Sequence, residues 1–386
     1  MLTACGTSQP PTPASTQTST IGTSKAATPV TTPAPATPSA TPTPEPAPPS
    51  LEQMAGQMMV VAFDGNDAAS AMQIVPAIEA GMLGAVVLFA SGTSPSNIIS
   101  PDQVAALTSG LQALSPGPRL LIFCDEEGGL VARLDDRFGF PATVSEQSMA
   151  TSQTTAQAAS VMASTLRAAG VNANLAPVVD VNVNPDNPII GSLGRSFSSD
   201  PRSVANNALQ FVDAMHSQGI LCTLKHFPGH GSSTADSHLG FVDVTDLWSD
   251  QELIPFQTVI AAGKADVVLS AHIFNAHLDP TYPATLSHAT ITGILRERLG
   301  YQGVVVTDGI TMKAITDFYG FSQAVELAIN AGVDMVSCAE SVLNGQSAGD
   351  AIRGVIVDAV KTGRIPVARV EESYARILAL RKRLSF

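Results

Sequence analysis

The sequence predicts a closed, parallel (β/α)8 barrel of the TIM type, preceded by a disordered stalk. After Leu51, short apolar runs rich in β-branched residues alternate with longer stretches that read as helices. Eight such runs are present, and parallel strands buried on both faces are near-continuously apolar. Eight of them separated by helices are the pattern of this barrel. A doubly wound open sheet is the alternative, but the count of eight favours closure.

The predicted elements follow one another in a regular order. The strands are expected at residues 57–63, 84–90, 119–124, 172–181, 221–227, 265–273, 303–309 and 333–339. Helices between them include residues 101–114, 199–219 and 324–332, and a final helix covers residues 367–384. We therefore expect the barrel domain to occupy residues 51–386.

The first fifty residues have a different composition. From Thr7 to Ser50 the chain is almost wholly Thr, Pro, Ser and Ala. Because large apolar side chains are nearly missing, this segment cannot form a core, and its prolines favour extended conformations. Residues 1–50 are thus expected to be a disordered stalk.

A short motif stands in front of this stalk. The residues LTAC, Leu2 to Cys5, with Gly6 after them, resemble the lipobox of bacterial lipoproteins. The charged start and apolar stretch of a signal peptide do not precede them, so the reading frame is expected to begin further upstream. We expect Cys5 to carry lipid and the protein to lie outside the cytoplasm, on the cell surface or the periplasmic side, touching membrane only through this lipid. A chance match is the alternative.

The composition excludes several function classes. A formal net charge of −13 opposes nucleic-acid binding, which requires clustered Lys and Arg. The remaining cysteines, Cys124, Cys222 and Cys338, lie in apolar runs and are expected to be small buried hydrophobes. No CxxC spacing supports a zinc or redox motif.

Titratable side chains stand at six of the eight predicted strand ends. They are Asp64, Asp125, Asp180, Lys225 with His226, His272 and Asp308. Active sites of such barrels lie at the carboxyl ends of the strands. We therefore expect these side chains to converge on one pocket.

The segment KHFPGHG, residues 225–231, raises two further interpretations. His226 and His230 have the i, i+4 spacing of a zinc site, but Pro228 and Gly229 between them prevent a helix. A phosphate-binding loop would feed a helix N-terminus, and no clear helix begins here. We therefore expect no metal and no cofactor.

Glycoside chemistry is the third interpretation. Hydrolysis with retention needs a carboxylate nucleophile and a second group that protonates the leaving oxygen. Asp308 stands at a strand tip among small residues, and Asp236 can orient the imidazole of His238 two residues further on. From spacing alone, Asp125, Asp180 and Asp308 are equal candidates for the nucleophile.

Four motifs in order resemble glycoside hydrolase family 3, in its bacterial β-N-acetylglucosaminidase branch. They are DEEGGLVARL (125–134), GSLGRSFSSDP (191–201), KHFPGHGSSTADSHLG (225–240) and VVVTDGITMKAI (304–315). The resemblance covers nearly everything from Leu51 onward. It implies that Asp308 is the nucleophile and that His238, paired with Asp236, is the acid/base. It also implies that the following residues bind sugar hydroxyls: Asp125, Arg133, Arg195, Lys225 and His226.

The resemblance further implies a monomeric enzyme acting on carbohydrate that bears terminal N-acetylglucosamine, from cell-wall fragments or from chitin oligosaccharides. Gly309, where the family has a second Asp, is expected to loosen the support of Asp308. Glu126 replaces the usual Gln and is expected to add a negative charge near the sugar. A phosphorylase that uses phosphate in place of water and a non-catalytic glycan-binding surface lipoprotein are the alternatives.

Overall fold

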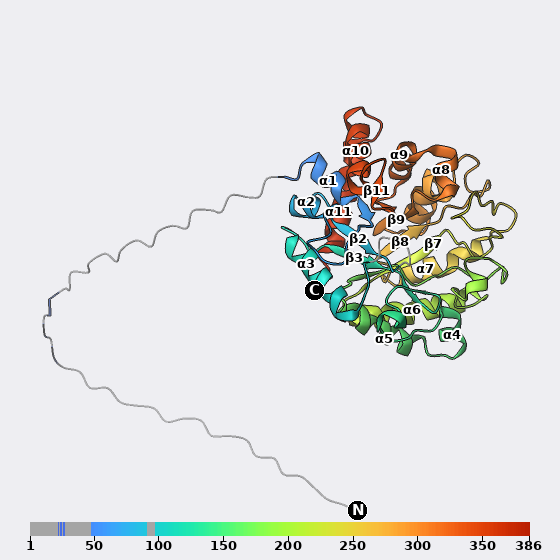
Figure 1. Cartoon of the computed structure of the whole chain (residues 1–386), viewed down its shortest axis with the longest axis horizontal. Helices are drawn as coiled ribbons and strands as arrows, with labels where there is room; N and C mark the ends of the chain where they lie inside the picture. Colours follow the sequence, from blue (N-terminus) through green and yellow to red (C-terminus); the bar gives the residue numbers. More distant parts are fainter. Residues whose placement is uncertain (1–21, 23, 25, 28–47, 91–96) are drawn as a thin grey trace, which may run out of the picture. The chain divides into compact units, whose positions relative to one another are not determined.

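Eight parallel strands close into a barrel in the computed structural model, which describes residues 22, 24, 26–27, 48–90 and 97–386 (Figure 1). The predicted barrel is thereby confirmed, whereas Cys5 and most of the predicted stalk lie outside the described residues. The barrel strands are β1 (Met59–Val61), β2 (Ala85–Leu88), β3 (Leu121–Cys124), β6 (Ala173–Asn174), β7 (Leu221–Phe227), β8 (Val267–Ser270), β9 (Val304–Gly309) and β10 (Met335–Cys338). Each falls within one predicted apolar run, and each pairs with the next along the chain.

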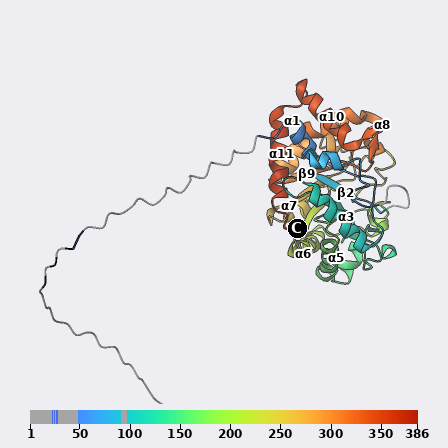
Figure 2. The same ribbon diagram turned by 60° about the vertical axis from the view of Figure 1, so that its left-hand side comes forward.

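The ladder closes between the first and last strands, because Met59 pairs with Val336. Helices α1 and α11 lie side by side next to this seam, as Figures 1 and 2 show. The guanidinium of Arg381 in α11 donates to the side chain of Gln57 in α1 and to the carbonyl of Arg119. The two ends of the barrel domain are therefore fastened to each other by a buried polar contact.

Helices surround the barrel. They are α1 (Leu51–Gln57), α2 (Val75–Glu79), α3 (Pro101–Leu114), α4 (Glu146–Thr151), α5 (Thr155–Ala168), α6 (Pro201–Ser217), α7 (Ile254–Ala261), α8 (Lys313–Tyr319), α9 (Phe321–Ala331), α10 (Ala348–Lys361) and α11 (Val367–Arg381), with a π-type helix η5 (Ala289–Arg298). Capping residues at the N-terminus initiate the longer helices. Asp200 caps α6 by accepting from the N–H groups of Arg202 and Ser203, and Pro201 occupies the first helical position.

One strand is much shorter than its apolar run. The sequence predicts a strand over residues 172–181, but β6 spans only two residues. Pro177 has no N–H to donate to a ladder, so the segment after it leaves regular pairing. A single further bridge, from Val178 to Lys225, keeps it beside β7. Because β6 ends early, Asp180 lies beyond the regular strand.

The pairing of β7 with β8 is irregular where the KHFPGHG segment (225–231) begins. Its register shifts between Leu224 and Phe227, so Lys225 and His226 lie outside the regular ladder. Side chains of consecutive strand residues normally point to opposite faces. Here both line the same cavity, because the irregularity redirects one of them. Among the described residues, the peptide bonds Ala176–Pro177, Lys225–His226 and Phe227–Pro228 are cis.

Candidate active site

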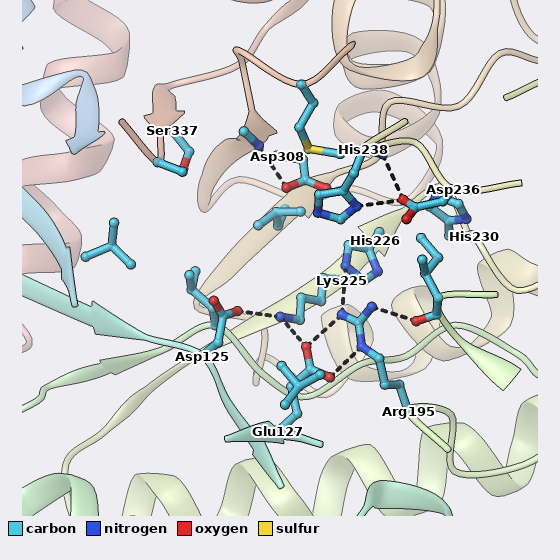
Figure 3. A pocket seen from close by; sticks show the side chains of 18 of the residues that line it. Asp125, Glu127, Arg195, Lys225, His226, His230, Asp236, His238, Asp308 and Ser337 are labelled. Carbon is cyan, nitrogen blue, oxygen red and sulfur yellow. Dashed lines mark hydrogen bonds and ion pairs between the residues drawn. The ribbon is translucent and has the colours of Figure 1, made fainter. Parts of the chain in front are cut away.

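A cavity of about 580 Å³ opens at the carboxyl ends of the barrel strands (Figure 3). Asp125 follows the last residue of β3, Lys225 and His226 stand near the end of β7, and Asp308 stands near the end of β9. All eight residues to which the family resemblance gave a chemical or sugar-binding role line this cavity: Asp125, Arg133, Arg195, Lys225, His226, Asp236, His238 and Asp308. Loops and strand tips that lie far apart in the sequence thus meet at one place.

Three of the polar strand ends do not line the cavity, so the expectation that all would converge is wrong for them. Asp64 is bound by Gln73 and Ser341. Asp180 is fully buried beneath His226, and buried His272 lies 2.9 Å from the carbonyl of Gly309. The polar atoms of these three side chains bind other protein groups instead of facing the cavity. The direction of a side chain at a strand end depends on the register of that strand, which the sequence does not show.

Asp308 lies near the tip of β9 and lines the cavity. Its Oδ1 accepts from the N–H of Gly309 at 2.8 Å. Burial by itself would raise the pKa of Asp308, but the nearby His272 and His226, together with that N–H, outweigh burial and hold the pKa below its usual range. The carboxyl is therefore an anion at neutral pH, as a nucleophile must be.

Asp236 and His238 form a pair within one loop. Oδ1 of Asp236 lies 2.7 Å from Nδ1 of His238 and also accepts from its backbone N–H at 2.8 Å. The side chain of His238 is 58% exposed, whereas that of Asp236 is 22% exposed. The carboxylate thus holds one ring nitrogen and leaves Nε2 free to exchange a proton.

A network of charged groups forms another wall of the cavity. Nζ of Lys225 lies 2.9 Å from Oδ1 of Asp125 and 2.6 Å from Oε1 of Glu127. Arg195 binds Glu127 with two hydrogen bonds of 2.7 Å, and Arg133 approaches Asp125 at 3.4 Å. Burial opposes ionisation of Asp125, but Lys225 and Arg133 outweigh it and depress its pKa. Alternating charges of this kind are rigid partners for sugar hydroxyls, which both donate and accept.

Glu127 is a site residue that the sequence analysis missed. Its carboxylate is buried, lines the cavity and accepts from both Arg195 and Lys225. Burial raises its pKa, but those two cations outweigh burial and lower it. A signal was available, because Asp125 and Glu127 are two apart and side chains two apart share one face of an extended segment.

Glu126, the residue between them, lies on the opposite side. It is buried, does not line the cavity, and accepts from the N–H of Leu134 at 2.9 Å. Burial raises the pKa of Glu126 to about 8, so the carboxyl is largely protonated at neutral pH. The expectation that Glu126 adds a negative charge near the sugar is therefore wrong, since its desolvated carboxyl behaves as a neutral group.

His226 is oriented by its neighbours. Its Nδ1 lies 2.7 Å from Oδ2 of Asp180, which can only accept, so this nitrogen carries a proton. On the other side of the ring, Nη2 of Arg195 lies 3.4 Å from Nε2. Asp180 therefore orients a ring that faces the cavity.

The glycines of KHFPGHG are required by close packing. A Cβ on Gly231 would lie 1.7 Å from the carbonyl oxygen of Val181. Gly229 has φ +122°, and a Cβ there would lie 2.5 Å from that of Glu252. The N–H of Gly231 donates to buried Glu252 at 3.0 Å, and burial raises the pKa of Glu252 to about 8. These contacts pack the turn at residues 229–231 closely against the barrel, ahead of His238 in the chain.

His230 connects this turn to the loop beyond it. Its Nδ1 lies 2.7 Å from Oγ of Ser233, and its Nε2 lies 3.3 Å from Oγ of Ser237. Burial, followed by the neighbouring His226, lowers the pKa of His230 to about 4, so the ring is neutral. Both ring nitrogens thus lie within hydrogen-bond distance of a serine hydroxyl, one in the turn and one in the loop.

Gly309 contributes through its backbone. Its N–H donates to Asp308, and its carbonyl accepts from Nε2 of buried His272. A Cβ at this position would lie 3.4 Å from the Cγ of Met312, which is ordinary contact. A Cβ therefore fits here, and the backbone support of Asp308 is present with glycine at this position.

One cluster within the described residues has the composition of a metal site, and it lies at the other end of β7. His216, Cys222 and Asp266 bring their ligand atoms within 4.8 Å of one another. The carboxylate of Asp266 already accepts from His216, from the N–H of Cys222 and from Arg383. The guanidinium of Arg383, which is half exposed, offsets the charge of buried Asp266, so the acceptor atoms of this cluster already have protein partners. The free Cys124, Cys222 and Cys338 are all buried, as predicted.

Comparison with known proteins agrees with this geometry. Residues 50–380 match the Glycosyl hydrolase family 3 N terminal domain. The Beta-hexosaminidase A of Pseudoalteromonas piscicida is 33% identical over 376 residues, which cover 87% of this chain and 62% of that protein. This chain therefore spans less than two thirds of that relative. An uncharacterized secreted glycosyl hydrolase of Arthroderma benhamiae is 32% identical over 79% of this chain and 86% of its own length.

Solved structures share the barrel. A glycoside hydrolase family 3 beta-N-acetylglucosaminidase from Paenibacillus sp. superimposes with a TM-score of 0.79 at 34% identity, over 88% of this chain and 63% of that one. The Beta-N-acetylhexosaminidase of Beutenbergia cavernae superimposes with a TM-score of 0.77 at 30% identity, over 87% of this chain and all of that one. Carboxylates, an Asp–His pair and a cation network at the strand ends of a barrel are the kinds of group that glycosidases use. This chain belongs to glycosyl hydrolase family 3.

Proposed function

We propose that the protein is a retaining, exo-acting β-N-acetylhexosaminidase that releases terminal N-acetylglucosamine. The observation that carries the proposal is that Asp308, the Asp236–His238 pair and the charged network around Lys225 line one cavity. An ionised carboxylate, a proton-exchanging imidazole and a set of hydroxyl ligands are the three parts that the reaction needs. Two relatives and both solved neighbours described above carry glycosidase names, which supports the same reaction class.

In the first proposed step, a carboxylate oxygen of Asp308 attacks C1 of the sugar. The bond from C1 to the leaving oxygen breaks, and that oxygen takes the proton from Nε2 of His238. A glycosyl ester of Asp308 and the free aglycone alcohol result. Asp236 stabilises the imidazole ring of His238, because its carboxylate accepts a hydrogen bond from Nδ1 throughout this step.

In the second proposed step, Nε2 of His238 takes a proton from water while the water oxygen attacks C1. The ester bond to Asp308 breaks, and the sugar leaves with its original β configuration after two displacements. Both residues return to their starting states. Phosphate in place of water would yield a sugar 1-phosphate, so product analysis decides between hydrolysis and phosphorolysis.

The proposed hydroxyl ligands are Asp125, Arg133, Arg195, Lys225 and His226. Each is held by a protein partner before a sugar arrives: Lys225 by two carboxylates, Arg195 by Glu127 and His226 by Asp180. Groups that are already oriented lose little entropy on binding.

The proposed location is outside the cytoplasm, anchored by lipid on Cys5, with cell-wall fragments as the first substrate class and chitin oligosaccharides as the second. The LTAC motif and the Thr/Pro stalk support this location. No helix in residues 48–90 and 97–386 is long and apolar enough to cross a membrane.

The test is an activity panel on the full chain. An aryl N-acetyl-β-glucosaminide and the matching aryl β-glucoside are each incubated in buffer with and without phosphate. We expect release from the first substrate, little from the second, and free N-acetylglucosamine as the product under both conditions. Tight sugar binding without turnover would refute the proposal.

A further inference from the structure

Three phenylalanine rings meet beside the loop that carries His238. The ring of Phe241 lies 5.3 Å from that of Phe274 and 5.4 Å from that of Phe318, centroid to centroid. The two contacts are tilted at 40° and 54°, within the distance range of favourable aromatic pairs. Phe241 therefore stands between two other elements of the barrel.

The positions of these rings in the chain connect the two reacting groups. Phe241 follows His238 by three residues in the same loop. Phe318 lies on α8, the helix that begins at Lys313, directly after the segment that contains Asp308. The Phe241–Phe318 contact thus joins the acid/base loop to the helix that follows the nucleophile strand.

The chain immediately after Phe241 is buried, whereas two of the residues shortly before it, His238 and Leu239, are exposed. Val242 and Val244 are buried, and backbone hydrogen bonds of 2.8 and 2.9 Å tie them to Phe274. Leu239 is 74% exposed, and the side chain of His238 hydrogen-bonds to Asp236 of the same loop. Phe241 therefore lies where the chain passes from these exposed residues to the buried segment at Val242.

We propose that Phe318 is a positioning residue that, through Phe241, holds the loop so that His238 meets the leaving oxygen of a sugar attacked by Asp308. The inference rests on the proposed acid/base role of His238. Phe318 acts through the loop and does not touch the reacting atoms. At 60% exposure, it contributes little to the core, so its removal leaves the barrel folded.

Phe318→Ala is compared with the wild type on a series of aryl N-acetyl-β-glucosaminides whose phenols differ in pKa. A displaced proton donor matters most when the phenol is a poor leaving group. We expect kcat/KM to fall about three- to tenfold for poor leaving groups and less than about twofold for activated ones. Phe318→Tyr keeps the ring and is expected to restore the wild-type dependence.

Tyr319→Ala is the matched control on the same helix. Its ring pairs with Tyr282 at 6.0 Å, and its hydroxyl donates to the carbonyl of Thr281, away from the loop. We expect this variant to keep the wild-type dependence on leaving group. If Tyr319→Ala and Phe318→Ala give the same losses, α8 has only a structural role and the inference fails.

A double-mutant cycle with His238→Ala separates this inference from the proposed function. If Phe318 acts through His238, adding Phe318→Ala to His238→Ala has no further effect on kcat/KM. Equal losses in both backgrounds, or a loss that is uniform across leaving groups, would overturn the inference. If His238→Ala itself shows no leaving-group dependence, the acid/base role in the proposed function fails instead.

Discussion

Lys225 at the end of β7 donates to Glu127 in the β4–β5 hairpin (Glu126–Gly128 and Val131–Ala132), across 2.6 Å. Both side chains are almost completely buried, and Arg195 binds the same carboxylate through two hydrogen bonds. One anion thus holds two cations at the proposed sugar-binding wall, in an environment where an unpaired charge is costly.

Glu127→Gln should destabilise the fold and weaken substrate binding. The amide cannot offset two buried cations, so we expect a loss of about 3 kcal/mol in the free energy of unfolding and a rise in KM of at least about tenfold. Urea unfolding and initial-rate kinetics measure the two effects. Glu126→Gln is the matched neighbour, and at pH 6 it should change neither quantity appreciably. Equal effects from both substitutions would contradict the assigned charges.

Glu126→Gln should instead reveal a dependence of stability on pH. The folded pKa of Glu126, about 8, is above its unfolded value, so the folded state holds a proton that the unfolded state loses between roughly pH 4.5 and 8. The stability that protonated Glu126 contributes is fully present below that window and falls as pH rises through it. Glutamine cannot ionise. The free energy of unfolding of the variant, relative to that of the wild type, should therefore increase by roughly 2–4 kcal/mol from pH 5 to pH 8. A constant difference across these pH values would show that Glu126 is ionised in the folded protein.

Asp308→Ala should reduce kcat by more than about 1,000-fold, because the substitution removes the proposed nucleophile. The melting temperature should stay close to that of the wild type. Added azide should restore turnover of an activated aryl glycoside, attacking C1 from the vacated face to give the α-glycosyl azide. The control is Asp64→Ala, which removes another strand-end carboxylate outside the cavity and should leave kcat unchanged. Retained activity in Asp308→Ala would mean that a different carboxylate attacks.

His238→Ala should lower kcat/KM by about 100- to 10,000-fold for substrates with poor leaving groups, and by much less for activated ones. Protonation of the leaving oxygen matters least when the phenol departs easily. His277→Ala, at an exposed histidine outside the cavity, is the control and should match the wild type. Losses of the same size across all leaving groups would show that His238 is not the proton donor.

Cys5→Ser should release the protein from the membrane fraction of its native host, when it is expressed there from its own gene. A single acyl chain binds membranes only marginally, so durable anchoring depends on the several chains of a lipoprotein cysteine. Labelled fatty acid should be incorporated by the wild type and not by the variant. Detection of unmodified wild-type protein in the cytoplasm would refute the anchor and leave the enzymatic proposal intact.

The order of the strands along the chain could be predicted from the sequence, because strand formation depends on short apolar, β-branched runs. Each barrel strand lies inside its predicted run. The same holds for α3 and for α11, whose predicted starts agree with the structure. The motifs that carry Asp308 and the Asp236–His238 pair could also be found, since their residues are close together in the chain.

The direction of individual side chains was decided only by the tertiary structure. Glu126 and Glu127 are neighbours, yet one is a neutral core group and the other joins two cations. Asp125 faces the cavity, whereas Asp180 is used to orient His226. The pairing of Phe241 with Phe318 likewise joins segments that no local pattern relates. Such contacts depend on register and on partners distant in sequence, and these are determined when the barrel closes.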